Sequence, residues 1–499
     1  MKYLISLLVI ILLLVGALYG VLFTSPGNNL LKPVIEKKIA AQVPLPTTLE
    51  TFVLRPDRFE IALKIGEDTR IEAKGTMNLM AQSVDATYLV DIKELANLQK
   101  LIGQKLNGPF KTNGTIKGDQ KMMHIDGVSD VAGSATDYHL ALRNFSPENL
   151  KAKIAHLHID RLLHMVNQPQ YAEGEVDIEA DIPSLNMKNL KGNVVTTIAK
   201  GLVHPAPVKS DFNLSIPANL TFKGNIHTRL TGTKAISNVD FVTSIASLKS
   251  KAVTYDISDG SLATDYHLHV PNLDDLYFVT NQHMKGKITV TGDVKVAKNG
   301  LEATAHSDTL GGAFDAIVKN NKVNVKIKNI QTVALTDMLL YPHIFDSRAN
   351  MNLDYDTVTQ QGVMHAELLN GQILPNKMSF MLRQMANFDI TREVYERTTL
   401  DTKIDRKVLH SDLYMKSKLT EISSKNGLVD LDKQYIDTTI NVKLKKMFIP
   451  VVLKGKLSNP EVKIDSKGLI KAKAKEELEK RLPDNIKKSP AGGLLKKLF

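Results

Sequence analysis

The chain has 499 residues and a formal net charge of +11, with 64 Lys and Arg against 53 Asp and Glu. Residues 466–499 alone hold ten basic and four acidic residues, so the rest of the chain is nearly balanced. A balanced body disfavours nucleic-acid binding, whereas a basic tail suits an anionic lipid surface. The chain lacks cysteine, which excludes disulfides, thiolate metal sites and cysteine nucleophiles.

Residues 3–23 form an uncharged apolar run that predicts a transmembrane helix. A helix of this length spans about 31 Å, which matches the hydrocarbon core of a bilayer. The alternative is a cleaved signal peptide, but those have a shorter apolar core and a small-residue cleavage site. We therefore expect residues 1–25 to be an uncleaved, single-pass anchor. The predicted anchor positions are Tyr3, Leu8, Leu13, Leu18 and Phe23.

Residues 26–46 follow as a predicted juxtamembrane helix and linker. Apolar residues recur at helical spacing over residues 28–42, and Pro44 and Pro46 end the pattern. Lys2 precedes the anchor and several lysines follow it, so the positive-inside rule orients the anchor only weakly. We place the body outside the cytoplasm because of the single-anchor layout and the character of the body.

The body alternates apolar and polar residues with a period of two, which predicts antiparallel β-sheet with one apolar and one polar face. Residues 323–328 are a clear example. Turn signals separate such runs at residues 298–300, 319–321 and 425–427. At one short strand and turn per 15 residues or so, residues 49–465 would contain roughly 25 strands.

An internal repeat runs through the body. Its unit is a strand, a short apolar helix, a variable loop and a glycine-containing strand. The copies lie at residues 95–119, 159–182, 273–294 and 335–356. Repetition predicts units that stack on their neighbours and form a quasi-one-dimensional body.

We therefore predict a mainly β fold: an N-terminal transmembrane helix, an elongated, curled antiparallel β-sheet groove with short interspersed helices, and a C-terminal helix. So wide a sheet is expected to curl, with its apolar face inside. No long amphipathic helices are left to cover that face, so we expect it to bind lipid. The predicted lining residues are Val176, Ile178, Ile288, Val290, Val323, Val325, Ile327, Leu413, Met415, Ile440, Val442 and Leu444.

Residues 362–465 resemble the C-terminal region of AsmA-like proteins. The resemblance lies in the order and spacing of segments such as GVMHAELLNGQIL, VLHSDLYMKS, GLVDL, YIDTTINV and GKLSNPEVKID. It implies a protein anchored in the inner membrane of a Gram-negative bacterium, with a curled β groove in the periplasm that carries phospholipids toward the outer membrane. The implied division is a repetitive β-groove body at 47–361, an AsmA-like region at 362–465 and a basic helical tail at 466–499.

No residue pattern points to catalysis. His267 and His269 share one face of a predicted strand, but a metal site needs a third ligand and an enclosed pocket. Asp274 and Asp275 are adjacent and fit a charged helix start better than a catalytic pair. Phosphate-loop, nucleophile-elbow and zinc-protease motifs are absent from the sequence. We expect neither an enzyme nor a cofactor or metal.

The predicted partners are phospholipids, the inner membrane, and outer-membrane or periplasmic proteins, without nucleic acid. The alternative function is an envelope assembly or scaffold factor that guides outer-membrane protein biogenesis, pairing its open strand edges with client strands. A structural tether across the envelope is a third reading. The tail at 466–499 fits either docking to a membrane or partner, or a solvated end.

Overall fold

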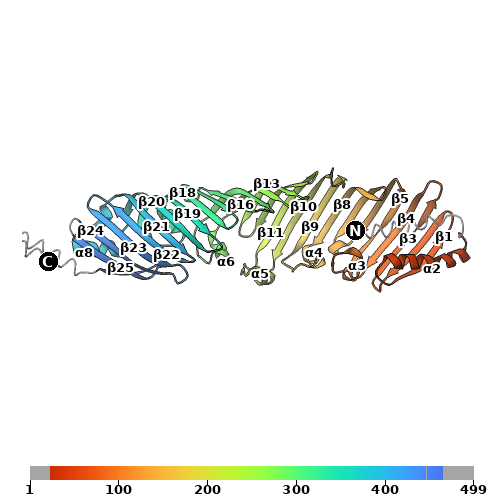
Figure 1. The fold of residues 1–499 in the computed structure, drawn as a ribbon, viewed down its shortest axis with the longest axis horizontal. Coiled ribbons are helices and arrows are strands. Elements are labelled where there is room, and N and C mark those ends of the chain that lie inside the picture. The colour runs from red at the N-terminus through yellow and green to blue at the C-terminus, as the bar shows by residue number, and fades with distance from the viewer. Residues whose placement is uncertain (1–22, 445–446, 465–499) are drawn as a thin grey trace, which may run out of the picture. The chain divides into compact units, whose positions relative to one another are not determined.

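The computed structural model describes residues 23–444 and 447–464. The fold is mainly β: 26 antiparallel strands follow one another in a sheet that is not closed (Figure 1). The chain divides into two compact units, Met1–Asp265 and Tyr266–Phe499, and the boundary falls within β14 (Leu262–Val270). The predicted strand count and the mainly β class are confirmed. The elongated, curled shape stays a prediction.

The first unit begins with a helix on the edge of its sheet and continues as a meander of strands. The helices are α2 (Ser25–Gln42), η1 (Leu95–Leu98), α3 (Gln99–Ile102), η2 (Val131–Gly133), α4 (Ile159–Met165) and α5 (Pro205–Phe212). The strands are β1 (Thr47–Leu54), β2 (Arg58–Ile65), β3 (Thr69–Asn78), β4 (Ser83–Ile92), β5 (Phe110–Asp119), β6 (Met122–Ser129), β7 (Ala135–Arg143), β8 (Ser146–His158), β9 (Ala172–Ser184), β10 (Lys191–Val203), β11 (Thr221–Thr231), β12 (Lys234–Thr243) and β13 (Ser247–Asp256).

The second unit has the same construction. Its helices are η3 (Leu273–Leu276), α6 (Tyr277–Thr280), α7 (Thr332–Met338), α8 (Lys377–Ala386) and η4 (Ile390–Arg392). Its strands after β14 are β15 (Ile288–Ala297), β16 (Gly300–Ser307), β17 (Ala313–Lys319), β18 (Lys322–Gln331), β19 (Phe345–Asp356), β20 (Gln361–Ile373), β21 (Tyr395–Asp405), β22 (Val408–Lys416), β23 (Thr420–Asp430), β24 (Tyr435–Leu444), β25 (Met447–Lys456) and β26 (Glu461–Ile464).

Within each unit, the two rims of the sheet differ. Each strand pairs with the next in antiparallel fashion, so connections that follow even-numbered strands leave at one rim and the others at the opposite rim. The helices α3, α4 and α5 follow β4, β8 and β10, and α6, α7 and α8 follow β14, β18 and β20. One rim of each unit therefore carries the helices, which we call the helical rim, while the other carries turns (Figure 1).

All four predicted repeat copies contain a short helix followed by a strand. These pairs are α3 with β5, α4 with β9, α6 with β15, and α7 with β19. The turns predicted at residues 298–300 and 319–321 separate consecutive strands. The turn predicted at 425–427 is wrong: these residues lie inside β23, where the pairing register with β22 shifts. Asn426 there has φ of 50°, because asparagine tolerates the left-handed region and can form a bulge as well as a turn.

The predicted juxtamembrane helix at 28–42 is α2, which starts at Ser25 and ends at Gln42. The predicted anchor positions Tyr3, Leu8, Leu13 and Leu18 and the basic tail at 466–499 lie outside the described residues. The fifth predicted position, Phe23, is described and packs, partly buried, against the hydrophobic cluster of the first unit. Among the residues that the structure describes, no helix combines the length and the apolar character that a membrane crossing requires.

Candidate functional site: the apolar face of the sheet

One paired row of mainly aliphatic residues, with Ser and Thr among them, crosses the first unit. Pairing registers place Leu63 beside Ile71, Ile71 beside Val90, and so on from strand to strand. Paired residues in antiparallel strands point to the same side of the sheet, so the row defines one face, which we call the apolar face. From β1 to β13 the row reads Leu49, Leu63, Ile71, Val90, Thr112, Ser129, Thr136, Ile154, Ile178, Thr196, Ile226, Val239 and Ser250.

Burial along this row falls from the first strands of the unit to the last. Leu63 and Val90 are 0% and 2% exposed, whereas Ile154, Ile178 and Ile226 are half-buried. On the last strand, the apolar-face residues Leu248 and Tyr255 are 38% and 44% exposed. The apolar face is thus packed at β1 to β7 and more open to solvent at β8 to β13.

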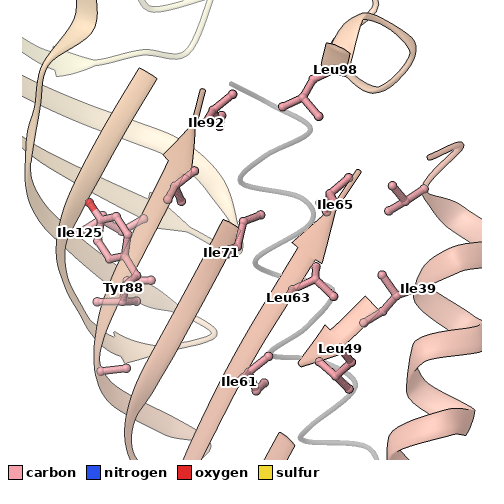
Figure 2. Close-up of a cluster of buried hydrophobic side chains, with 14 of the residues drawn as sticks. Ile39, Leu49, Ile61, Leu63, Ile65, Ile71, Tyr88, Ile92, Leu98 and Ile125 are labelled. Atoms are coloured by element: carbon pink, nitrogen blue, oxygen red, sulfur yellow. The ribbon is translucent and has the colours of Figure 1, made fainter. Parts of the chain in front are cut away.

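The packed end forms a hydrophobic cluster to which α2 contributes. Side chains of β1 to β6 point toward one another and toward Ile39 of α2 (Figure 2). Leu98 of η1 and Met165 of α4 join the same cluster from the helical rim. Burial of such side chains stabilises the unit by roughly 1.5–3 kcal/mol each. At this end, the prediction that the chain leaves its apolar face uncovered is wrong, because α2 and the rim helices pack against it.

Two tyrosines lie over a pair of glycines on this face. Registers align Tyr88, Gly114, Gly127 and Tyr138 on β4 to β7. A Cβ at Gly127 would lie 2.2 Å from the Tyr88 hydroxyl oxygen and 2.7 Å from Cζ of Tyr138, so the rings occupy the space that the missing side chain leaves. The two hydroxyls are 2.5 Å apart, and Thr112 Oγ1 lies 2.6 Å from that of Tyr138. Burial raises the pKa of Tyr88 above its usual value, so the hydroxyl of Tyr88 stays neutral at physiological pH.

Ser and Thr side chains on the apolar face form hydrogen bonds with one another across neighbouring strands. Thr228 and Ser237 are 2.8 Å apart at their hydroxyl oxygens, and Ser250 and Thr264 are 2.9 Å apart. Cross-strand hydroxyl pairs reduce the cost of placing polar atoms on an apolar surface, since each group keeps a partner without water.

The second unit has a corresponding apolar face. From β16 to β26 one paired row reads Ser307, Phe314, Ile327, Met351, Ala366, Leu400, Leu413, Ser424, Ile440, Val451 and Ile464. On β16 and β17, apolar-face residues such as Ala303 and Phe314 are half-buried. On β23 to β25, Ile422, Val442 and Ile449 are 0–1% exposed.

Helix α8 and η4 cover the later strands of this face. Leu382 of α8 and Ile390 of η4 are both fully buried in one cluster with Tyr395 and Val442. Burial raises the pKa of Tyr395 to about 12, and its hydroxyl bonds to Thr420 Oγ1 at 2.8 Å. The expectation of an uncovered face is wrong here too, and the half-buried strands β15 to β17 are the more open part of the unit.

All twelve residues predicted to line a groove fall on the apolar face of their unit. Val325, Ile327, Met415, Val442, Leu444 and Val176 are buried, while Ile178, Ile288, Val290, Val323, Leu413 and Ile440 are half-buried. The alternation of the sequence predicts which side each residue faces. That these residues contact lipid stays a prediction.

The opposite, polar face carries opposite charges on neighbouring strands. Lys117 pairs with Asp85 at 2.9 Å and Lys454 with Asp437 at 2.8 Å. Such exposed pairs contribute little stability individually, but together they keep this face solvated. A hollow of about 490 Å³ on the polar side of β7 to β10 has charges of both signs in its lining, including His139, Lys151, Lys153, Glu179 and Asp181. It therefore favours no single charged ligand.

The same type of hydrogen bond recurs at β-bulges on the polar face. At four bulges, a side-chain oxygen on the next or preceding strand accepts the exposed backbone N–H. Asp177 accepts from His156 at 2.9 Å, Asn350 from Asn329 at 2.9 Å, Asp412 from Asn426 at 2.8 Å and Asp265 from Ala252 at 3.0 Å. These bonds stabilise an amide that has lost its place in the ladder.

Two of the residues weighed as metal ligands or catalytic groups, His269 and Asp274, have structural partners. His269 Nδ1 lies 2.9 Å from Thr289 Oγ1, and Asp274 pairs with His283 at 2.8 Å. His267 lies on the polar face and is exposed. Over the described ranges, no group of three or more His, Asp or Glu residues is placed to hold a metal ion.

Sequence reasoning missed two features of this face: the tyrosine–glycine row and the cover formed by α8. The tyrosine–glycine row becomes apparent only when the pairing registers of β4 to β7 are known. Helix α8 did have a signal, because Asn376 and Ser379 form a reciprocal capping box at its start. Comparisons with protein-family models, curated proteins and solved structures found no match to this chain.

Proposed function

We propose that this chain is an AsmA-like protein of the Gram-negative envelope whose apolar face shields phospholipid acyl chains in a curled periplasmic groove. Residues 3–23 would hold it in the inner membrane as a single-pass anchor, with the bulk of the chain in the periplasm. Acting in this way, it would contribute to lipid transfer toward the outer membrane and to the homeostasis of that membrane.

The observation that carries the proposal is the paired row that crosses thirteen strands of the first unit, in which aliphatic residues outnumber Ser and Thr, with a solvated, charged face behind it. Over β8 to β13 its isoleucines are half-buried. An apolar surface of this extent is uncommon on a protein that has no partner for it. A fatty acyl chain is a suitable ligand, since each buried CH₂ gains about 0.8 kcal/mol while the headgroup stays in water.

The assembly-factor alternative requires an open strand edge, and the edge at β1 is covered. Asn28 Nδ2 of α2 donates to Leu54 O at 3.1 Å, and Leu54 N donates to Asn28 Oδ1 at 2.9 Å. Lys32 Nζ also donates to Glu50 O at 2.9 Å. These bonds use backbone groups through which a client strand would pair.

A charge on the open part of the apolar face tests the proposal. Ile178→Glu places a carboxylate in the row between Ile154 and Thr196, where an acyl chain would pass. We expect this variant to lose most of its transfer of a fluorescent phospholipid between donor and acceptor vesicles, because a charge opposes apolar contact. Lys200→Glu, at an exposed position on β10, is the matched control and should transfer as the wild type does. Equal transfer by both folded variants would contradict the proposal.

Photo-crosslinking distinguishes the two functions directly. A photoreactive amino acid at position 178 or 290 should yield phospholipid adducts in envelope preparations, detected by mass spectrometry. Adducts with outer-membrane proteins alone would support the assembly function and oppose the lipid proposal.

A further inference from the structure

Helix α2 has apolar residues on two opposite sides. Leu31, Ile35 and Ile39, with Val43 directly after the helix, face the sheet and are 2–5% exposed. Leu30 and Val34, one turn apart, face away from it and are 69% and 51% exposed. We call the side that bears Leu30 and Val34 the outer side of α2. A surface helix normally has its apolar residues on the buried side only, so the outer side requires its own explanation.

The chain that precedes α2 indicates what covers this side. Residues 3–22 are uncharged and strongly apolar, and α2 begins at Ser25. Lys37 and Lys38 follow along the helix, and both are exposed. Exposed apolar residues with lysines nearby, directly after an apolar run of membrane-spanning length, are typical of a helix in the bilayer interface.

The start of α2 is fixed to the sheet. Arg55, which follows β1, donates to Phe23 O and to Ser25 Oγ, both at 2.8 Å. The side chain of Asn28 bonds to both backbone groups of Leu54. Because these bonds hold the segment between residue 23 and β1, a membrane at the outer side of α2 would keep a defined position relative to β1.

We propose that the outer side of α2 lies on an anionic phospholipid bilayer, with Leu30 and Val34 among the acyl chains and Lys37 and Lys38 at the lipid phosphates. This inference rests on the membrane anchoring proposed above, and it adds which surface of the protein contacts the bilayer. It sets the bilayer beside β1, where the apolar face of the first unit begins. Lipid would then enter the apolar face from the β1 end.

Environment-sensitive labels on single cysteines test the contact, and the native chain has no cysteine to interfere. The full-length protein is reconstituted in nanodiscs of phosphatidylcholine with or without phosphatidylglycerol. We expect fluorophores on Leu30→Cys and Val34→Cys to shift their emission to the blue and to be quenched by spin-labelled lipids. A fluorophore on Thr48→Cys, exposed on the polar face of β1, is the control and should report water. Emission at positions 30 and 34 equal to that at position 48 would overturn the inference. The same result is expected if a partner protein, and not the bilayer, covers this side of α2 in cells.

The lysines are tested in the same nanodiscs. In the presence of phosphatidylglycerol, Lys37→Glu with Lys38→Glu should reduce quenching at position 30 several-fold, since each lysine near an anionic surface contributes attraction. Without the anionic lipid, the substitutions should change little. Unchanged quenching in both lipid mixtures would overturn the proposed contact of Lys37 and Lys38 with the lipid phosphates. If position 178 crosslinks to lipid but the label at position 30 reports water, this inference is rejected and the proposed function stands. If the label at position 30 reports lipid but position 178 forms no lipid crosslink, the proposed function alone is rejected.

Discussion

At the residue scale, carboxylates on the polar face stabilise the bulges that interrupt the strands. Asp412 is the clearest case, because its Oδ1 accepts from Asn426 N at 2.8 Å and its Oδ2 lies 2.9 Å from Lys425 Nζ. The backbone N–H of Asn426 and then the Lys425 ammonium lower the pKa of Asp412 below its usual value. The charged form of Asp412 is therefore part of the folded structure of β22 and β23.

Removal of this carboxylate should loosen the bulge. In Asp412→Ala, we expect the amide of Asn426 to exchange its hydrogen several-fold faster, since a strained N–H loses its acceptor. Asp401→Ala is the matched control: Asp401 is paired with Asp412 across β21 and β22 but bonds to His365 instead. Hydrogen exchange with mass spectrometry measures both variants, and equal exchange at Asn426 would show that Asp412 does not hold the bulge.

The tyrosine–glycine row predicts a specific intolerance on the apolar face. Gly127→Ala would put a methyl group where the Tyr88 and Tyr138 rings meet, and we expect it to cost about 1–3 kcal/mol as overpacking. Combining it with Tyr138→Ala should recover part of that loss, because the ring that clashes is gone. Thermal unfolding of the two single variants and the double variant gives the coupling between the sites. Additive effects would mean that the rings do not fill the space above Gly127.

At the scale of single elements, α2 completes the edge of the first unit. Its inner residues fill the cluster beside β1, and Asn28 replaces a neighbouring strand by pairing with the backbone of Leu54. An edge strand without such a partner presents free N–H and C=O groups and invites pairing with another chain. The helix thus protects the edge and contributes apolar packing.

Asn28→Ala should expose this edge. We expect a loss of about 1–3 kcal/mol, because the buried backbone groups of Leu54 lose their partners, together with a tendency to form oligomers through β1. Asn29→Ala, at the exposed neighbouring position, is the control and should remain near the wild type. Denaturant unfolding and size-exclusion chromatography check the two expectations. A monomeric Asn28→Ala variant with unchanged stability would show that this pairing is dispensable.

At the scale of the whole molecule, several carboxylates act in the same direction on stability. Burial opposes the ionisation of seven aspartates, but hydrogen bonds, joined at most of them by a nearby lysine or arginine, lower their pKa values: Asp256, Asp265, Asp356, Asp389, Asp412, Asp430 and Asp437. When the pH falls below about 4, the unfolded chain binds protons at these sites before the folded chain does. The stability that they contribute is present above that pH and is lost as the pH falls further.

We therefore expect the urea midpoint of unfolding to decrease steeply as the pH falls from about 5 to about 3. Circular dichroism at a series of pH values measures it. In Asp356→Asn the decrease should be smaller, because this residue then no longer takes up a proton on unfolding. A midpoint that rises on acidification would contradict the assigned direction of these shifts.

Much of the fold follows from local patterns. The alternation at residues 323–328 predicts β18 and the side that each residue faces. Apolar spacing predicts α2, and the internal repeat predicts the rim helices α3, α4, α6 and α7. The turn signal at 425–427 misleads, because an Asn-Gly pair suits a bulge as well as a turn. The cover of the apolar face by α8 was not predicted, because its anchor Leu382 packs against strands that are far away in sequence.

The sequence by itself determined the β class, the two faces of the sheet and the apolar character of residues 3–23, because each depends on the order of side chains along one segment. The tertiary structure decided which strands bury the apolar face and which leave it half open. It also decided how α2 holds the edge at β1 and where the tyrosines meet over Gly127. These features arise from contacts between distant segments, whose geometry is set by strand pairing and not by any local pattern.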